Sequence, residues 1–273
     1  MMQAKVKQLK VEIKEVKKVK NDIFLLNFQS SHIAKVAQPG NFLHLKLKST
    51  ILRRPLSIHK IKNNLIYILF KVRGRGTKVL AKKKKNDQLD VIGPLGNGFK
   101  VKNGKNSILV AGGIGVAPLL FLAQKLVESP TSKVQSPKSE RIILLGAKDK
   151  KEVVCEKEFK NLSFQVNIST EDGSKGEKGF VTDLLKKRLR TLPACWRGRD
   201  LGLRTSIYVC GPKDMFYQIS KIVKNYKNVN TQLSFEQFMG CGVGVCCACV
   251  IPTKAGYKKV CQDGPVFGLE EVY

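Results

Sequence analysis

From residue 4 to about residue 101, the chain alternates between apolar and polar positions in short segments that turn signals separate. Alternation with a period of two places successive side chains on opposite faces of a β-strand. The alternating segments are residues 5–15, 22–27, 41–46, 65–72 and 88–92. Short strands at this spacing, with Gly and Pro between them, predict an antiparallel β-barrel over residues 1–104.

The pattern changes after residue 105, where continuous apolar runs alternate with helical segments. Residues 107–111 form an apolar run typical of a parallel strand buried on both faces. A glycine-rich turn and a helical stretch at 117–127 follow it. Further buried strands are predicted at 142–145, 164–168 and 207–209, and a helix at 213–226. This alternation predicts an open parallel sheet over residues 105–231, with surface loops inserted at 129–140 and 194–204.

Four cysteines near the C-terminus follow the spacing C-x4-C-x2-C-x11-C, at Cys241, Cys246, Cys249 and Cys261. The first three reproduce the spacing of plant-type [2Fe–2S] ferredoxins, in which the fourth ligand comes later in the chain. The loop's two glycines can take positive φ and let it curl around a cluster. Zinc is the alternative, but it favours two short cysteine pairs and the second is missing. Residues 232–273 therefore predict an iron–sulfur subdomain in which Cys247 is not a ligand.

Composition and cysteine usage indicate the cellular compartment of the protein. Of 273 residues 42% are hydrophobic, and no stretch is apolar over the roughly 18–20 residues that span a bilayer. The basic N-terminus runs into the alternating pattern and not into an apolar signal core. The other cysteines, Cys155, Cys195, Cys210 and Cys247, are scattered, which suits a reducing compartment. We expect a cytoplasmic protein without membrane insertion.

The formal net charge of +29 raises a second class of function, a redox-sensing nucleic-acid binder. The Lys and Arg residues are spread along the chain, and the densest run, residues 82–85, has no interleaved aromatic side chain for base stacking. We therefore interpret the charge as solvated surface and expect no specific nucleic-acid partner. An acidic partner surface is a third interpretation.

Two motifs in the barrel region predict contacts with a flavin nucleotide. In R-P-L-S, Arg54 can bind a pyrophosphate through two hydrogen bonds and Ser57 can reach a ring nitrogen. Alone, this segment also fits a proline-broken edge strand with solvated arginines. About twenty residues on, in residues 74–77, two glycines allow close approach to phosphate and Thr77 adds a hydroxyl group, although a simple glycine turn also explains that segment.

The glycine-rich turn at residues 112–118 follows a predicted buried strand and opens a helix, which is the context of a dinucleotide site. It is not a strict G-x-G-x-x-G. Cys210 and Gly211 end the last predicted parallel strand, at the carboxyl edge where ligands bind in such sheets. Both motifs predict a nucleotide at the same edge.

The motifs R-P-L-S, G-x-G-T, G-G-I-G-V-A-P and C-G-P, in this order, resemble the ferredoxin–NADP reductase superfamily. The C-terminal cysteines and residues 93–99 and 171–174 narrow the resemblance to electron-transfer subunits of NAD-dependent class 1B dihydroorotate dehydrogenases, over essentially the whole chain. The two inserted loops, Cys247 and the high lysine content depart from that pattern without touching a motif residue.

The resemblance implies an N-terminal FAD-binding β-barrel, a Rossmann-like parallel-sheet NAD domain and a small C-terminal [2Fe–2S] subdomain. The residues that would hold FAD are Arg54, Pro55, Leu56, Ser57, Leu69, Phe70, Lys71, Gly76 and Thr77. The residues that would border NAD are Gly112, Gly113, Gly115, Glu171, Cys210 and Gly211. Because Glu171 and Asp172 would repel a 2′-phosphate, we expect NAD rather than NADP, with Glu171 the more important.

The resemblance also implies a partner. A separate FMN-containing catalytic subunit would oxidise dihydroorotate in pyrimidine biosynthesis and send electrons through this chain to NAD, in a heterotetramer of two subunits each. We expect the contact at residues 239–249. The three histidines, His32, His44 and His59, lie away from any catalytic constellation and are interpreted as structural.

The nearest alternative is the FAD and [2Fe–2S] subunit of a ferredoxin:NAD(P) oxidoreductase or of a sulfur-metabolising hydrogenase. Those relatives often have aspartate in place of the first cluster cysteine. The first cluster position here is Cys241, which favours the dihydroorotate dehydrogenase assignment.

Overall fold

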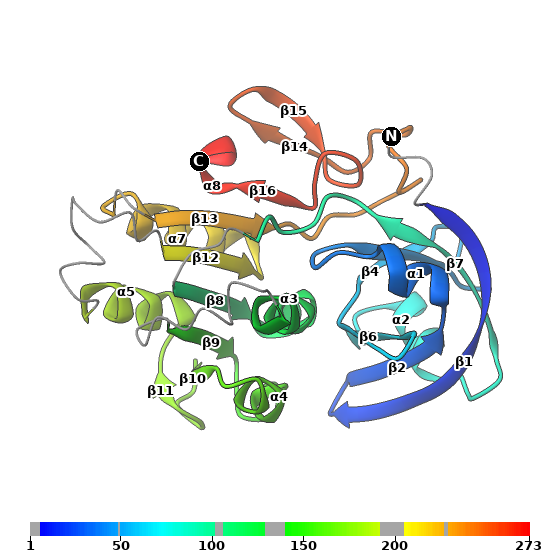
Figure 1. Ribbon diagram of the computed structural model, residues 1–273, viewed down its shortest axis with the longest axis horizontal. Helices are drawn as coiled ribbons and strands as arrows, with labels where there is room; N and C mark the ends of the chain where they lie inside the picture. Colours follow the sequence, from blue (N-terminus) through cyan, green and yellow to red (C-terminus); the bar gives the residue numbers. More distant parts are fainter. Residues whose placement is uncertain (1–5, 49, 102–105, 129–139, 192–204, 227–228) are drawn as a thin grey trace.

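The computed structural model describes residues 6–48, 50–101, 106–128, 140–191, 205–226 and 229–273. These residues form two large sheets side by side, with a small C-terminal hairpin at their common edge (Figure 1). The predicted loops at 129–140 and 194–204 lie outside the described residues, except for Glu140. Within the described ranges, no helix has the length and apolar character needed to cross a membrane.

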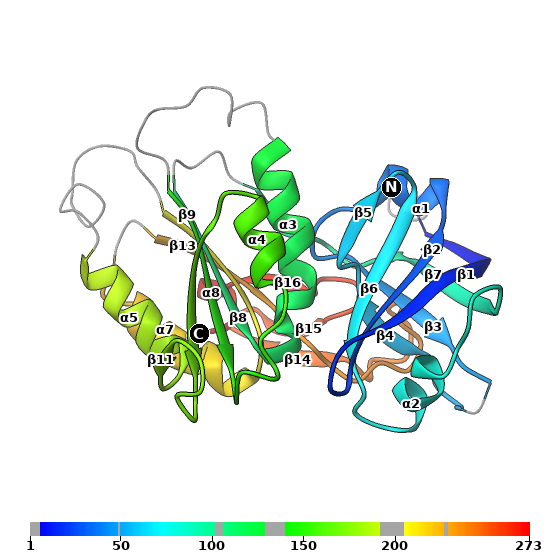
Figure 2. The same ribbon diagram turned by 90° about the horizontal axis from the view of Figure 1, so that it is seen from below.

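The N-terminal sheet has seven antiparallel strands in the order β4-β3-β7-β1-β2-β6-β5. The strands are β1 (Lys7–Lys20), β2 (Ile23–Gln29), β3 (Phe42–Lys46), β4 (Arg54–Ser57), β5 (Lys60–Lys62), β6 (Leu65–Lys71) and β7 (Gln88–Leu95). The sheet curls around a core that includes Phe28, Leu43, Leu45 and Ile68 (Figure 2). The predicted barrel is confirmed in the form of this curled sheet.

Strand β1 accounts for the curl, because both halves of the sheet share it. Residues 7–12 pair with β7, and residues 13–20 pair with β2. The register shifts between Ile13 and Glu15, and such an irregularity bends a strand and increases its twist. The strand extends past residue 15, where the sequence predicts its end. Its second half is a largely exposed hairpin arm rich in lysine, so the alternation of apolar and polar residues that marks the first half is missing there.

The second sheet is parallel except at one edge, with the order β11-β10-β9-β8-β12-β13-β16. Its strands are β8 (Asn106–Gly112), β9 (Arg141–Ala147), β10 (Gln165–Thr170), β11 (Glu177–Lys178), β12 (Thr205–Cys210), β13 (Val229–Ser234) and β16 (Val266–Gly268). The last strand, β16, runs antiparallel to β13. The predicted parallel sheet is confirmed, and the antiparallel edge strand is an addition.

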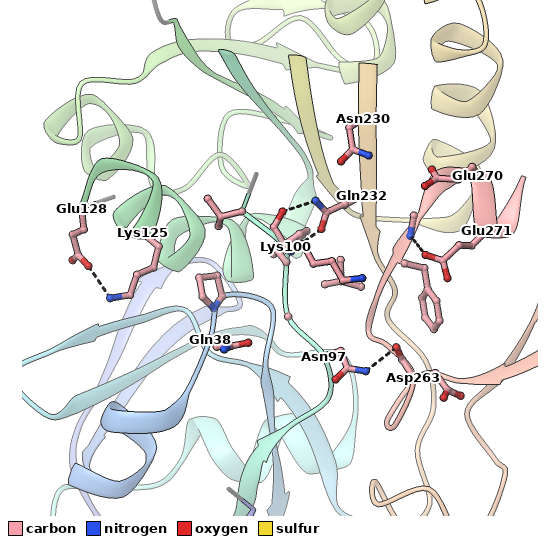
Figure 3. A pocket seen from close by; sticks show the side chains of 17 residues that line it. Gln38, Asn97, Lys100, Lys125, Glu128, Asn230, Gln232, Asp263, Glu270 and Glu271 are labelled. Carbon is pink, nitrogen blue, oxygen red and sulfur yellow. Dashed lines mark hydrogen bonds and ion pairs between the residues drawn. The ribbon is translucent and has the colours of Figure 1, made fainter. Parts of the chain in front are cut away.

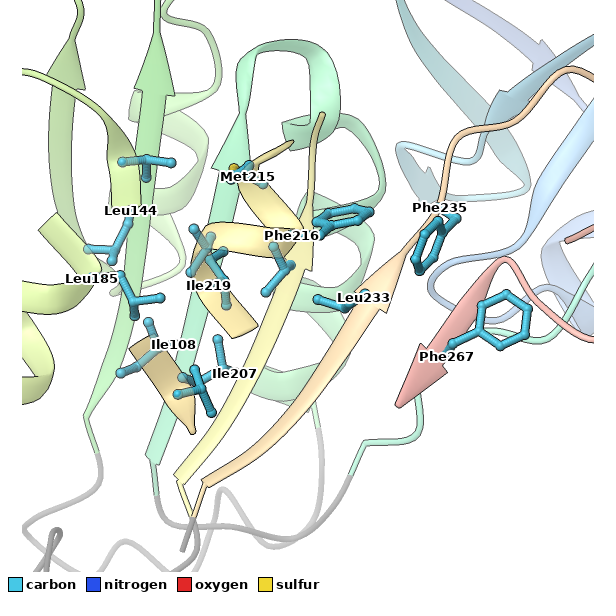
Figure 4. Packing of buried hydrophobic residues seen from close by; sticks show 14 of the residues in the cluster. Ile108, Leu144, Leu185, Ile207, Met215, Phe216, Ile219, Leu233, Phe235 and Phe267 are labelled. Carbon is cyan, nitrogen blue, oxygen red and sulfur yellow. The ribbon is translucent and has the colours of Figure 1, made fainter. Parts of the chain in front are cut away.

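Helices cover both faces of the second sheet (Figures 2 and 4). Ile108 and Val110 of β8 point to the face under α5 and α7, and Leu109 and Ala111 point to the face under α3 and α4. The helices are α1 (Ser31–Val36), α2 (Arg75–Ala81), α3 (Val116–Glu128), α4 (Glu156–Asn161), α5 (Val181–Thr191), α7 (Lys213–Val223) and α8 (Leu269–Val272), with a 3₁₀ turn η1 (Gly113–Gly115). Strand β8 is therefore buried on both faces, as its continuous apolar run predicts.

The C-terminal segment leaves the second sheet after β13 and returns to it at β16. Between these strands it forms the hairpin of β14 (Val250–Thr253) and β15 (Gly256–Lys259), at the top of Figure 1. One hydrophobic core joins Phe42 of β3 with Leu233, Ile251 and Phe267. The predicted boundary at 231/232 falls inside β13, and the three-domain division stays a prediction.

Candidate functional site

The cysteine loop directs backbone N–H groups toward sulfur. Cys241 Sγ accepts hydrogen bonds from the N–H groups of Val243 at 3.4 Å, Val245 at 3.3 Å and Cys246 at 3.4 Å. Cys246 Sγ accepts one from the N–H of Cys241 at 3.3 Å. Burial opposes ionisation of the Cys241 thiol, but these N–H groups together lower its pKa to about 6. The loop therefore favours the thiolate, the form that binds metal.

The two glycines of this loop have the positive φ that the sequence predicts, +74° at Gly242 and +87° at Gly244. A Cβ at Gly242 would lie 2.5 Å from His44 Nδ1, and one at Gly244 would lie 2.4 Å from Gln262 Oε1. Lys259 Nζ donates to the carbonyl oxygen of Gly244 at 2.8 Å. The loop is thus held from both sides, and only glycine fits at these two positions.

The other two predicted ligands form a second, buried pair. Cys249 and Cys261 are each 3% exposed, and the N–H of Cys261 donates to Cys249 Sγ at 3.4 Å. Burial and the neighbouring Cys249 thiol raise the pKa of Cys261 to about 12. Among the described residues, no group of three or more His, Cys, Asp and Glu side chains surrounds a single metal position. Two pairs of cysteines suit a cluster of two irons held by four thiolates.

The structure brings the two predicted flavin motifs together. Gly76 lies so close to β4 that a Cβ there would be 2.8 Å from Arg54 Nε. Arg54 Nη1 donates to the carbonyl oxygen of Leu52 at 2.6 Å, and no carboxylate among the described residues pairs with its guanidinium. Arg53 Nη1 instead binds Asp90 Oδ1 at 2.9 Å. Arg54 is therefore the arginine whose charge is available to a phosphate.

Thr77 is engaged within its own turn. Its Oγ1 accepts hydrogen bonds from the N–H groups of Arg73 at 2.9 Å and Gly74 at 3.2 Å, and it donates to the carbonyl oxygen of Gly74 at 3.1 Å. It shapes the glycine turn before α2, and its predicted contact with FAD stays a prediction. Three further predicted residues are half-buried in β4: Pro55, Leu56 and Ser57.

Residues 69–71 point in different directions from β6. Leu69 is buried against the second sheet, and Phe70 is buried in the barrel core, where its ring stacks on Phe24 at 5.9 Å. Lys71 forms an ion pair with Glu152 in the loop after β9. A flavin would meet the backbone of Leu69 and Phe70 rather than their side chains, and these contacts stay predictions.

The predicted nucleotide residues meet at the carboxyl edge of the second sheet. A Cβ at Gly115 would lie 2.3 Å from the carbonyl oxygen of Cys210, and the Cα of Gly112 lies 3.1 Å from where a Cβ of Gly211 would be. Gly113 has φ +55°, and a Cβ there would meet nothing within 4 Å. The motifs G-G-I-G and C-G-P therefore fit against each other, and Gly113 faces open space.

Glu236 is a candidate residue that sequence reasoning missed. It lies two residues beyond the end of β13, and its side chain is exposed. Burial, and after it the charge of Glu236, raises the pKa of the Cys210 thiol. A protonatable carboxyl group thus lies near the cysteine of C-G-P. Its place just beyond the carboxyl end of a strand is the signal that could have found it.

Glu171 and Asp172 differ in availability. The Asp172 carboxylate accepts a hydrogen bond from the N–H of Ser174 at 2.9 Å, and the bonds from Ser174 lower its pKa. Glu171 is exposed, and its contact with NAD stays a prediction. Phe180, two residues beyond β11, is 61% exposed and offers an aromatic face that sequence reasoning missed.

His59 lies between β4, which carries the R-P-L-S motif, and α3, which follows the glycine-rich turn. It is 3% exposed, and its Nδ1 donates to the carbonyl oxygen of Ala117 in α3 at 2.8 Å. Its Nε2 lies 4.0 Å from Cys155 Sγ, and burial lowers its pKa to about 4. A neutral His59 therefore joins the end of β4 to the G-G-I-G-V-A-P motif.

A groove of about 820 Å³ lies away from these motifs (Figure 3). Its lining includes Gln38, Lys125 and Glu270, and none of the predicted site residues. Within it, the Gln232 amide binds both backbone groups of Lys100, at 2.7 and 2.8 Å. The groove lies between residues 97–101, which follow β7, and strand β13, and we assign no cofactor to it.

Comparisons with known proteins define the class first. Residues 109–221 match the oxidoreductase NAD-binding domain, and residues 236–273 match the iron–sulfur cluster binding domain of dihydroorotate dehydrogenase B. A solved NADH-dependent reduced ferredoxin–NADP oxidoreductase, described in work on flavin-based electron bifurcation, superimposes with a TM-score of 0.81 at 32% identity, covering 96% of this chain and 89% of that one. A ferredoxin–NADP⁺ reductase from Neisseria gonorrhoeae shares the fold, with a TM-score of 0.66 at 15% identity and coverage of 84% and 99%. The class is that of ferredoxin–NADP reductase-like oxidoreductases.

Curated relatives then define the family. The dihydroorotate dehydrogenase B (NAD⁺) electron transfer subunit of Desulforamulus reducens is 36% identical over 89% of this chain and 90% of its own length. The subunit of the same name from Bacillus cereus is 37% identical over 94% and 95%. The chain belongs to the family of dihydroorotate dehydrogenase B electron transfer subunits. This confirms the predicted resemblance, the oxidoreductase class, and the iron–sulfur and NAD-binding regions.

The cysteine assignment predicts opposite results for two neighbouring thiols. Cys247 is exposed, and its Sγ lies 3.9 Å from the carbonyl oxygen of Val245, outside the N–H groups that converge on Cys241. Cys247→Ser should keep iron, sulfide and the visible spectrum of the parent, whereas Cys241→Ser should lose or strongly destabilise the cluster. A Cys247→Ser protein without a cluster, beside an intact Cys241→Ser protein, would reverse the assignment.

Arg54, in β4, and Arg53, just before it, should differ in their effect on FAD binding. Arg54→Ala should weaken FAD binding by about tenfold or more, because it removes a charge-assisted bond to phosphate worth roughly 1.5–3 kcal/mol. Arg53→Ala is the matched control and should hold FAD affinity within about threefold, since Arg53 is occupied by Asp90. Titration of the apoprotein with FAD, followed by flavin fluorescence, measures both. Equal losses in the two variants would contradict the role of Arg54.

Proposed function

We propose that this chain carries electrons from an FMN-containing dihydroorotate dehydrogenase catalytic subunit, by way of a [2Fe–2S] cluster and FAD, to NAD⁺ in pyrimidine biosynthesis. It works in the cytoplasm, as its scattered free thiols suggest, in a complex of two subunits each. Family membership and the two matched regions support the electron-transfer role. The partner, its FMN and the stoichiometry are our inference.

The observation that supports this most strongly is the place of β4 between the two other sites. On one side β4 pairs with β3, whose residue His44 hydrogen-bonds to the cysteine loop. On the other side the chain leaves β4 and reaches His59, which binds Ala117 of the nucleotide motif. A flavin bound to β4 would therefore lie between the cluster that delivers electrons and the nicotinamide that accepts them.

When bound, the cluster supplies single electrons, FAD interconverts single electrons and pairs, and NAD accepts a hydride. The chain's own residues position these groups. Arg54 would hold the FAD phosphate, and the segments of Gly115 and Cys210, which fit closely against each other, would border the nicotinamide nucleotide.

The cysteine loop has the surface of a docking site for a protein. Residues 237–253 carry no charged side chain, although the whole chain has a net charge of +29. Within this segment Phe238 is 92% exposed, Val245 79% and Val243 48%. Exposed apolar side chains and the depletion of charge are typical of the central part of a protein interface. The catalytic subunit is the partner that requires contact with this loop.

A second candidate function is the flavin and iron–sulfur subunit of a ferredoxin-dependent NAD(P) oxidoreductase. This candidate is supported by the 32% identity and the TM-score of 0.81 between this chain and such a protein, over 96% of this chain. Cys241 at the first ligand position supports the dihydroorotate dehydrogenase assignment instead. Electron delivery from reduced ferredoxin, without electron delivery from an FMN-containing dihydroorotate dehydrogenase subunit, would select the second function.

The partner is tested with the reconstituted complex. The isolated chain should reduce artificial acceptors with NADH and should not oxidise dihydroorotate, whereas the mixture with the catalytic subunit should couple dihydroorotate oxidation to NAD⁺ reduction. Val245→Asp should weaken the complex by about tenfold or more, since a buried charge at an interface centre is costly. Tyr257→Asp, at an equally exposed position of the β14–β15 hairpin, is the control and should bind as the parent does. Dihydroorotate turnover by the isolated chain would refute the proposal.

Nucleotide choice follows from Glu171. The parent should favour NADH over NADPH by about tenfold or more, because like charges about 4 Å apart repel by roughly 1 kcal/mol in water and by more near a protein surface. Glu171→Gln should narrow this ratio, and Asp172→Asn should change it less, since the Asp172 carboxylate is bound within its own turn. Steady-state kcat/KM with both nucleotides checks this. Equal efficiency of the parent with both would count against the assignment.

A further inference from the structure

We propose that His44 is a positioning residue that holds the first cluster ligand, Cys241, against the flavin-binding barrel. The inference rests on the proposed function, since it concerns the cluster site and the flavin strand named there. Sequence reasoning interpreted His44 as structural, and the family comparisons say nothing of it.

His44 faces outward from the barrel toward the cysteine segment. In β3, Leu43 and Leu45 point into the barrel core, so the alternate residues Phe42 and His44 point to the opposite face. Phe42 belongs to the core that contains Cys249 and Cys261. The outer face of β3 is therefore the surface on which the cysteine segment rests, and His44, 0% exposed, lies within that contact.

A single polar contact fixes the ring. His44 Nδ1 lies 3.2 Å from the carbonyl oxygen of Cys241, and because a carbonyl oxygen only accepts, Nδ1 carries the proton and donates. Among the described residues, His44 Nε2 has no hydrogen-bond partner. The ring is thus held by its Nδ1–H alone, and the buried Nε2 is the polar atom that the arrangement leaves unpaired.

The loop is shaped to receive this ring. A Cβ at Gly242 would lie 2.5 Å from His44 Nδ1, so the peptide that follows Cys241 lies directly on the imidazole. The carbonyl group that His44 binds belongs to this same peptide unit. Fixing its orientation also fixes the course of the chain that leads to the N–H groups on Cys241 Sγ. His44 therefore acts on the cluster site through the loop and touches no ligand sulfur.

The same residue contacts the flavin strand. In the antiparallel ladder His44 pairs with Pro55 of β4, within the R-P-L-S motif. The carbonyl oxygen of His44 also accepts a hydrogen bond from Arg53 Nη1 at 3.2 Å. One hydrogen bond and one residue thus connect a cluster ligand to the strand proposed to hold FAD. We infer that His44 fixes the distance between the two cofactor sites and the hydrogen bonding at Cys241.

The experiment compares three substitutions in the full chain with its cofactors. His44→Asn places an N–H where Nδ1 stood, His44→Gln moves the donor toward the position of Nε2, and His44→Leu removes it. The readouts are the g-values of the reduced cluster by electron paramagnetic resonance, its midpoint potential, and the rate at which NADH-derived electrons reach the cluster. Hydrogen bonds to sulfur raise the potential of such clusters, so a disordered loop should lower it.

His44→Asn should keep the parental g-values and potential and stay within about threefold of the parental rate. His44→Gln and His44→Leu should shift the g-values, lower the potential and slow the transfer by about tenfold. If His44→Leu does not fold, the comparison of His44→Asn with His44→Gln decides alone. His59→Leu, which removes a buried Nδ1–H donor whose acceptor is Ala117 and not the cysteine loop, is the control and should leave the cluster spectrum unchanged.

The outcomes separate the inference from the proposed function. Parental g-values, potential and rate in His44→Gln, with a cluster present, overturn the role of His44 and leave the proposed function intact. The same shift in His59→Leu as in His44→Gln also overturns it, because the effect would then be a general loosening of the barrel. A parent protein whose iron and sulfide analysis shows no cluster sinks the proposed function itself.

Discussion

The rings of Phe216, Phe235 and Phe267 pack edge to face, with centroids 4.9 Å apart in the first pair and 5.8 Å in the second. They come from α7, from the chain after β13, and from β16 (Figure 4). Buried aromatic rings contribute both apolar area and specific geometry. Phe42 of the barrel belongs to the same core, as do Cys249 and Cys261. This core therefore joins elements of all three predicted cofactor regions.

The two buried histidines, His44 and His59, each connect two separate parts of the fold. His59, just beyond the end of β4, binds Ala117 of α3, and His44 of β3 binds Cys241 of the cysteine loop. Each ring donates through Nδ1 to a backbone carbonyl group, which keeps its orientation independent of neighbouring side chains. Electron transfer and hydride transfer both depend on short, fixed distances, and backbone carbonyl groups in a packed fold are suitable fixed points.

Local signals in the sequence predicted much of this. The cysteine spacing, the glycines with positive φ and the continuous apolar run of β8 each depend on a few adjacent residues. The helix α5 was overlooked although Val181, Leu184, Leu185 and Leu189 follow the helical period, because charged residues dominate it. Strand β16 has only three residues, and its pairing with β13 depends on distant chain. The contact of His44 with Cys241 joins residues 197 positions apart, and no local pattern reports such a contact.

The burial of Cys249 and Cys261 in the shared core has a thermodynamic consequence. Any ligand that binds only the folded chain stabilises it by an amount that grows with the logarithm of the ligand concentration divided by the dissociation constant, and metal ions held by thiolates are among the tightest such ligands. Because these two proposed ligands lie in the core that also contains residues of α5, α7 and β13, cluster assembly would be linked to the folding of the half of the molecule that contains the parallel sheet. Iron supply thereby acts on the population of folded chain as well as on its redox capacity.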